Sequence, residues 1–227
     1  MSDKKYQVIA YHGWGFDPSI WQPLQEKMTP SAHFQAADRG YFSGSMLPSW
    51  DESLNSEKLL LVHSYGLHWC DSEVLQKADH LVIISGFLKF HPESGKEYKR
   101  SKFALRKMQS QFVDSPRKVL QKFYERVFYP QEPELDLPKN LQHDLLLSDL
   151  GDLDHDNRQN ADIFDTNSIT IIHGSEDKIV NNELARYMFS KLRLRSQYFE
   201  IKKAGHGVPY THSSKIFEIL NSLLKFN

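Results

Sequence analysis

The chain has 227 residues, a quarter of them charged, and a formal net charge of -1 at pH 7. This length accommodates one α/β domain with an inserted subdomain. The near-zero net charge gives no global reason to expect nucleic acid or a membrane surface as a partner. Cys70 is the only cysteine, which excludes an intramolecular disulfide and any multi-cysteine metal cluster.

The first residues, Met1 to Tyr6, are polar and carry two lysines, and no long apolar stretch follows them. They lack the apolar region of a signal peptide, and no window approaches the roughly 18 apolar residues of a membrane span. We therefore expect a cytoplasmic protein without a membrane anchor, and we expect it to be a monomer.

Short apolar runs bounded by turn residues recur along the chain and predict strands. Most are continuously apolar rather than alternating, and long segments separate them, so they predict a mostly parallel sheet flanked by helices, an α/β fold. The strand runs are Gln7–Tyr11, Lys58–Val62, His80–Ile84, Ser168–Ile172 and Gln197–Lys202, with a weaker one before Asp38. Apolar spacings of three and four predict helices at Ser19–Met28, Tyr65–Lys77, Asn181–Leu192 and Ser213–Lys225.

The segment from Phe87 to Pro130 is long, helical in pattern and strongly basic. It holds eleven Lys and Arg against four Asp and Glu, a net charge of +7. We predict a helical cap over residues 87–130, inserted in a core formed by residues 1–86 and 131–227.

An acidic stretch follows the cap. Residues 130–165 hold ten Asp and Glu against Lys139 and Arg158. Two interpretations stay open: the acidic stretch neutralises the basic cap, or the cap binds an anionic partner.

Ser64 is the candidate nucleophile, in the run Leu61-Val62-His63-Ser64-Tyr65-Gly66 between a predicted strand and a predicted helix. A serine at such a sharp turn projects its hydroxyl above the sheet, and the amide of Tyr65 points at the same space. Gly66 supplies a small residue where strand and helix approach. Val62, however, stands where the usual G-x-S-x-G motif has glycine. Taken alone, this run favours a helix-capping serine over a nucleophile.

Two later loops supply the partners that a serine nucleophile needs. Asp177 follows the predicted strand Ser168–Ile172, and His206, between two glycines, follows the last predicted strand. Loops after parallel strands meet at the carboxyl edge of the sheet, and the order Ser, Asp, His is the one expected for this fold. We predict that His206 accepts the Ser64 proton and that Asp177 orients the imidazole.

The run His12-Gly13-Trp14-Gly15 follows the first predicted strand. Its glycines let the chain fold back, so that the amide of Trp14 can pair with that of Tyr65 as an oxyanion hole. One such donor typically contributes about 3 to 4 kcal/mol to transition-state stabilisation. A simple strand-ending turn would explain the glycines but not their pairing with Ser64.

The other histidines and the acidic run predict no metal site and no cofactor, because no H-x-x-x-H or H-E-x-x-H pattern occurs. Five of them are expected to have structural roles, roles in supporting the site residues, or no role: His12, His63, His68, His173 and His212. The triplet Asp152, Asp154 and Asp156 imitates the start of a calcium loop, but Asn157 and Ile163 stand where that loop needs glycine and glutamate.

Together these ordered motifs resemble the α/β-hydrolase family over nearly the whole chain, and Asp38–Ser45 resembles the loop after the family's next strand. Within that family, the chain is similar to the pimeloyl-acyl-carrier-protein methyl ester esterases of biotin synthesis. The similarity lies in the first glycine loop with Asp17 and Trp21, and in the cap sequence between Ser101 and Arg126.

The resemblance implies a serine carboxylesterase that hydrolyses the methyl ester of pimeloyl-acyl-carrier protein, with the carrier protein as its partner. It implies an apolar acyl channel under the cap, for which we predict wall residues Trp14, Tyr65, Leu88, Phe103 and Phe112. The predicted carrier-protein contacts are Arg100, Arg106, Lys107, Arg117 and Lys122.

Alternative functions stay open at this point. A short-chain acyl esterase, a thioesterase or a lyase related to the menaquinone pathway would use the same residues. Val62 is the feature that favours a non-catalytic ligand receptor, although all three candidate triad positions hold competent residue types.

Overall fold

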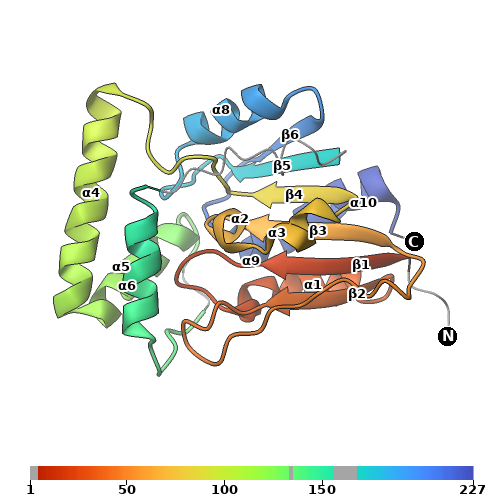
Figure 1. Ribbon diagram of the computed structural model, residues 1–227. Coiled ribbons are helices and arrows are strands. Elements are labelled where there is room, and N and C mark those ends of the chain that lie inside the picture. The colour runs from red at the N-terminus through yellow and green to blue at the C-terminus, as the bar shows by residue number, and fades with distance from the viewer. Residues whose placement is uncertain (1–4, 133–134, 156–167, 227) are drawn as a thin grey trace.

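The computed structural model describes residues 5–132, 135–155 and 168–226, and centres on a six-stranded sheet in the order β2-β1-β3-β4-β5-β6 (Figure 1). Every neighbouring pair is parallel, which confirms the predicted sheet. The strands are Tyr6–Tyr11 (β1), Ala32–Ala37 (β2), Glu57–His63 (β3), His80–Ile84 (β4), Ser168–Gly174 (β5) and Ser196–Ile201 (β6).

The burial of the strands explains their sequence. All six residues of β1 are buried, and β3, β4 and β5 are buried beyond their first residues, as continuous apolar runs in a sheet covered on both faces require. The edge strands β2 and β6 are partly exposed and alternate more in polarity. The weak signal of β2 follows from this edge position.

Helices cover both faces of the sheet. On one face α1 (Gln22–Met28), preceded by the 3₁₀ turn η1 (Pro18–Trp21), packs with α9 (Val208–Thr211) and α10 (Ser213–Leu224). The other face is covered by α2 (Gly66–Trp69), α3 (Ser72–Gln76) and α8 (Asn182–Leu192). The predicted single helix over Tyr65–Lys77 is wrong, because extended backbone at Cys70 and Asp71 divides it, and the Asp71 carboxylate caps α3 by accepting from Glu73 and Val74.

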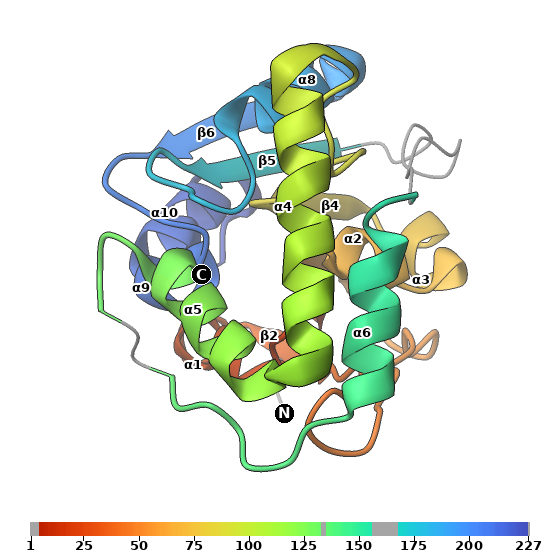
Figure 2. The ribbon, with the colours of Figure 1, turned by 90° about the vertical axis from the view of Figure 1, so that its left-hand side faces the viewer.

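Three further helices form a layer beyond the carboxyl ends of the strands (Figures 1 and 2). They are α4 (Gly95–Asp114), α5 (Pro116–Phe128) and α6 (His143–Asp152), and α4 packs on both others. Within the predicted cap, helical structure is confirmed for α4 and α5, whereas residues 87–94 form no helix. Since α6 packs in the same layer, we propose that the cap includes α6 as well. Among the described residues, no helix is long and apolar enough to cross a bilayer.

Candidate active site

Ser64 occupies a strained turn between β3 and α2. Its φ is +54°, a conformation that L-residues adopt at a cost of roughly 1–3 kcal/mol. The Ser64 amide donates to the Ile84 carbonyl at 2.9 Å, which anchors the turn to β4. A Cβ at Gly66 would lie 2.3 Å from the Tyr11 carbonyl oxygen, so the approach of α2 to β1 requires glycine there. The predicted sharp turn is confirmed.

Val62 does not disturb this turn. Its side chain is fully buried in the apolar cluster that lies between the sheet and the helices α2, α3 and α8. The tight contact beside the serine falls on Gly13 instead, where an added Cβ would lie 2.9 Å from the Ser64 Cβ. Glycine is thus required on the neighbouring loop rather than two residues before Ser64.

Ser64, His206 and Asp177 form one hydrogen-bonded chain. The Nε2 of His206 lies 2.9 Å from the Ser64 Oγ, and its Nδ1 lies 2.7 Å from the Asp177 Oδ2. The histidine and aspartate side chains are buried, while Ser64 keeps 7% of its surface exposed. The serine hydroxyl can therefore donate to Nε2 while Nδ1–H donates to the carboxylate, the tautomer that a general base requires.

The Asp177 carboxylate is held ionised by its surroundings. Burial alone would raise the pKa of Asp177, but His206, His173 and the Val180 amide outweigh it and leave the pKa below its usual value. The Oδ1 atom accepts from the Ile179 and Val180 amides at 2.8 and 2.9 Å. This acid is thus oriented before any substrate binds.

The glycine loop after β1 lies against the nucleophile and is fixed by the cap. Trp14 donates its indole N–H to the Leu146 carbonyl of α6 at 2.8 Å, and Tyr124 of α5 donates its hydroxyl to the Gly15 carbonyl at 2.8 Å. Trp14, Ser64 and Tyr65 line the same cavity. The two segments predicted to supply oxyanion donors are therefore brought together.

A cavity of about 630 Å³ opens above Ser64, between the sheet edge and the cap. Apolar side chains from core and cap line it, among them Phe87, Phe90, Leu105, Met108, Val119, Phe123, Leu150, Leu153, Ile179 and Leu184. Five cationic side chains also line it: Arg100, Lys107, Lys122, Arg126 and Lys178. A volume and a lining of this kind suit a drug-sized or acyl ligand with an anionic portion.

Several predicted substrate contacts lie elsewhere. Of the predicted wall residues, Trp14 and Tyr65 line the cavity; three predicted carrier-protein contacts, Arg100, Lys107 and Lys122, line it as well. Phe103 is 70% exposed, because it lies off the α4 face that Ala104, Leu105 and Met108 present to the cavity.

Leu88 and Phe112 are buried, but outside the cavity lining. Leu88 belongs to the apolar cluster on the α2 and α8 side, whereas its neighbour Phe87 lines the cavity. Phe112 packs against Trp14 with ring centroids 5.9 Å apart, so it supports a wall residue rather than forming the wall.

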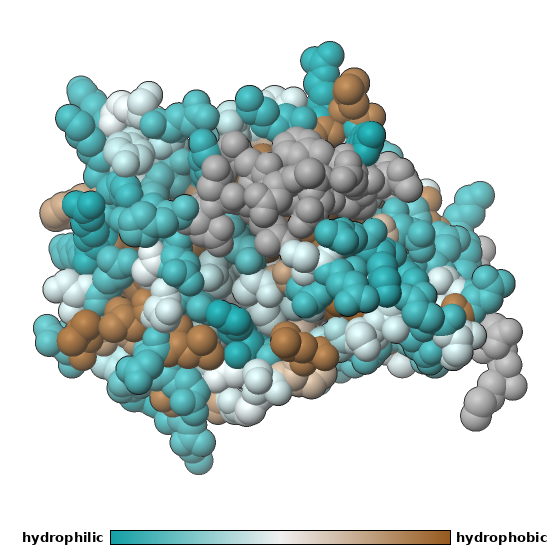
Figure 3. All heavy atoms as spheres, in the orientation of Figure 1, coloured by the Kyte–Doolittle hydropathy of each residue, from teal (hydrophilic) through white to brown (hydrophobic). Residues whose placement is uncertain are grey.

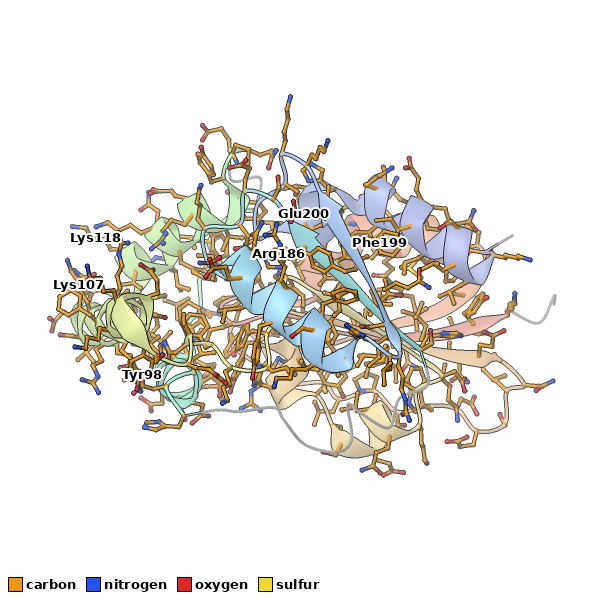
Figure 4. The ribbon with its side chains drawn as sticks, turned by 90° about the horizontal axis from the view of Figure 1, so that it is seen from above. Tyr98, Lys107, Lys118, Arg186, Phe199 and Glu200 are labelled. Carbon is orange, nitrogen blue, oxygen red and sulfur yellow. The ribbon has the colours of Figure 1, made fainter. Side chains whose placement is uncertain are left out.

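Two of the predicted carrier-protein contacts are also outside the cavity lining. Arg106 is exposed on α4. Arg117 donates to the Pro138 and Lys139 carbonyls at 3.0 and 3.1 Å and fastens the segment after α5. Lys107 and Lys118 project from the cap end of the molecule, away from the sheet (Figure 4).

The acidic stretch neutralises part of the cap. The Asp154 carboxylate lies 2.8 Å from Lys102 and 3.1 Å from His91. Arg100, Lys107 and Lys122 instead border the cavity. Neutralisation by the acidic stretch is therefore observed at Lys102, and an anionic partner of the cap stays a prediction.

A partly buried ion pair that sequence reasoning missed ties α6 to the core. Arg39 donates through Nε and Nη2 to the two Asp149 oxygens, each at 2.8 Å, and Tyr41 donates its hydroxyl to Asp149 at 2.7 Å. The partners are more than a hundred residues apart, so no local sequence pattern indicates the pair.

The cavity face of α4 could have been predicted from the sequence, because Ser101, Leu105 and Met108 recur at helical spacing.

Within the described residues, no three His, Cys, Asp or Glu side chains cluster closely enough to hold a metal ion. Asp154 is engaged by Lys102 and His91. Asp156, Asn157 and Ile163 of the calcium-loop comparison lie outside the described residues.

No protein-family model matches this sequence, and no curated protein matches it. Solved structures do. An esterase from Exiguobacterium antarcticum has a TM-score of 0.77 and 17% identity, covering 97% of this chain and 92% of its own. A bromoperoxidase from Bacillus anthracis has a TM-score of 0.79 and 18% identity over the same shares. BioG from Haemophilus influenzae has a TM-score of 0.62 and 17% identity, covering 92% of each chain. The chain therefore has the α/β-hydrolase fold.

Proposed function

We propose that the protein is a serine carboxylesterase with Ser64 as nucleophile, His206 as general base and Asp177 as the acid that orients it. The observation that carries this proposal is the unbroken hydrogen-bonded chain of these three residues, which ends at Ser64 in the lining of the cavity. The hydroxyl of serine is too weakly acidic to attack unaided, and a neutral imidazole at 2.9 Å removes that obstacle.

The reaction follows from this geometry. The Ser64 Oγ bonds to the ester carbonyl carbon while its proton passes to the His206 Nε2, and the amides of Trp14 and Tyr65 stabilise the oxyanion. His206 then returns the proton to the departing alcohol as the carbon–oxygen bond breaks. A water molecule then attacks the acyl carbon while its proton passes to His206; the bond from this carbon to the Ser64 Oγ breaks, His206 returns the proton to Oγ, and the carboxylic acid leaves.

For the substrate we propose the methyl ester of pimeloyl-acyl-carrier protein. The sequence resemblance in the glycine loop and cap supports it, and so does the lining, where apolar walls suit the acyl chain and the cationic side chains suit a phosphate. An acidic carrier protein would dock on the cap, whose outer surface is basic and, with Phe103 and Val113, partly apolar. The largest apolar patch in Figure 3 lies over the cap helices.

A short-chain acyl esterase or thioesterase is the second candidate. The observation that favours it is the higher TM-score with the Exiguobacterium antarcticum esterase, 0.77, than with BioG, 0.62. These functions share the triad and differ in whether the carrier protein contributes to binding.

Hydrolysis of pimeloyl-acyl-carrier-protein methyl ester beside a p-nitrophenyl butyrate control separates the two candidates, with wild type and Ser64→Ala measured together. The methyl ester of free pimelate is measured as a third substrate. We expect serine-dependent turnover of the carrier-bound ester, with a kcat/KM well above that of the free methyl ester. Turnover of the small ester alone would reject the carrier-protein substrate, and Ser64-independent turnover would reject the mechanism.

A further inference from the structure

His63, the residue before the nucleophile, contacts the backbone of the proposed base. The side chain is fully buried, and its Nε2 lies 3.0 Å from the carbonyl oxygen of His206. Only a protonated nitrogen can make this bond, so Nε2–H donates to the carbonyl. Among the described residues, the other ring nitrogen, Nδ1, has no hydrogen-bond partner. The side chain therefore acts on its surroundings through one donor.

The segment that carries His206 needs such an anchor. Gly205 and Gly207 flank the histidine, and glycine leaves the backbone more freedom than any other residue. Other hydrogen bonds fasten the neighbouring residues: the Gly207 amide donates to the Val127 carbonyl at 3.0 Å, and the Glu176 amide donates to the Ala204 carbonyl at 2.8 Å. The bond from His63 reaches His206 itself.

We infer that His63 is a positioning residue for His206: its Nε2–H holds the His206 carbonyl and thereby sets the imidazole at hydrogen-bond distance from the Ser64 hydroxyl. This inference rests on the esterase function proposed above. Since His63 and Ser64 are consecutive residues at the end of β3, one short piece of backbone carries both the nucleophile and the anchor of its base. The 2.9 Å separation between Ser64 Oγ and His206 Nε2 is then fixed by adjacent residues.

The environment of His63 keeps it suited to this role. Its ring packs between Phe16, Trp21 and His206, with centroids 5.7, 6.3 and 4.9 Å away. Burial, together with the nearby His206, lowers the pKa of His63 well below its usual value. A neutral His63 leaves Asp177 to stabilise the cation that forms on His206 during attack, without a second positive charge beside it.

Paired variants of His63 test the inference. His63→Leu removes the donor and keeps the bulk, while His63→Gln retains an uncharged N–H donor at similar reach. With p-nitrophenyl butyrate, the leucine variant should lose roughly 100-fold in kcat with KM nearly unchanged, the scale expected for a misplacement of about 1 Å. The glutamine variant should stay within about threefold of wild type by the same reasoning.

Gln7→Leu is the matched control. Gln7 is as buried as His63 and donates to the Asp51 carbonyl at 3.0 Å. It lies near the start of β1, at the edge of the sheet away from the active site. This variant should lose thermal stability and keep the wild-type kcat.

A second readout needs no substrate. In the proton NMR spectrum, the downfield signal of the His206 Nδ1–H that is bonded to Asp177 should broaden in His63→Leu and persist in His63→Gln.

The outcomes separate the claims. Wild-type kcat in a folded His63→Leu, or equal losses in both variants, would overturn the positioning role. Should the leucine variant fail to fold, the glutamine variant decides, and a kcat at least tenfold below wild type would count against the inference. If wild type shows no Ser64-dependent turnover, the esterase function fails instead, and the His206 proton signal still judges the anchor.

Discussion

Replacing Asp149 with asparagine tests how the cap is fastened to the core. The carboxylate is 1% exposed and accepts two bonds from Arg39 and one from Tyr41. Burial and the nearby carboxylate raise the pKa of Tyr41 well above its usual value, so the hydroxyl keeps its proton and donates. Asparagine preserves the shape, but it removes the charge and turns one acceptor atom into a donor facing these donors.

The magnitude follows from which groups lose their partners. The side chain of Arg39 is one-third exposed, so water compensates part of its loss, whereas Tyr41 is fully buried and cannot be hydrated. Loss of the charge and of one buried hydrogen bond should lower the free energy of unfolding by about 2–3 kcal/mol. For a chain of this size, that is a decrease in Tm of roughly 5–10 °C.

Urea unfolding followed by circular dichroism measures the change. Asp152→Asn on the same helix is the control, because Asp152 is exposed; its effect should stay within about 0.5 kcal/mol. A double-mutant cycle with Arg39→Gln should give a coupling free energy of at least about 1 kcal/mol. Equal stability changes for Asp149→Asn and Asp152→Asn, or no coupling, would refute the fastening role of this ion pair.

Three further predictions concern the turn at Ser64, the loss of stability at acidic pH, and the cap. Gly66→Ala should lower the free energy of unfolding by more than about 2 kcal/mol, because its Cβ would clash with the Tyr11 carbonyl. Gly44→Ala, which has open space around it, should leave the free energy of unfolding nearly unchanged, and thermal unfolding of both variants makes the comparison. Burial lowers the pKa of His63 and of His173 in the folded state, so their stabilisation is complete above about pH 6.5 and declines as the pH falls toward the folded pKa. Between pH 6.5 and 5, His63→Gln should therefore flatten the pH dependence of stability by up to about 1.4 kcal/mol per pH unit, and parallel curves would contradict this. Lys107→Glu should raise KM for the carrier-bound ester about tenfold, about 1.4 kcal/mol of binding, and KM for p-nitrophenyl butyrate less than twofold; equal increases would argue against an anionic partner at the cavity.

The sheet and the site geometry were predictable from sequence because both depend on local patterns. Continuous apolar runs identify strands buried on both faces, and in a parallel sheet every strand delivers its following loop to one edge. Ser64, Asp177 and His206 each follow such a run, so their convergence follows from topology. The division of the helix at Cys70 was missed because the apolar spacing continues through the break.

The cavity lining was predictable only in part, because the direction of a side chain depends on packing. Phe103 and Leu105 are two positions apart on α4, yet the first is exposed and the second faces the cavity. The phase of a helix against its neighbours is set by contacts that no single segment encodes. The pairing of Arg39 with Asp149 is missed for the same reason, since it depends on how α6 returns to the core.

Labelling with a serine-directed fluorophosphonate tests the central claim most directly, because it needs no knowledge of the substrate. Intact-mass measurement and peptide mapping of wild type should show one adduct, on Ser64. Ser64→Ala should show none, and His206→Ala should react at least about a hundredfold more slowly, because the hydroxyl then lacks its base. An unlabelled Ser64 in the folded wild type, or labelling at the same rate without His206, would contradict an activated nucleophile at this site.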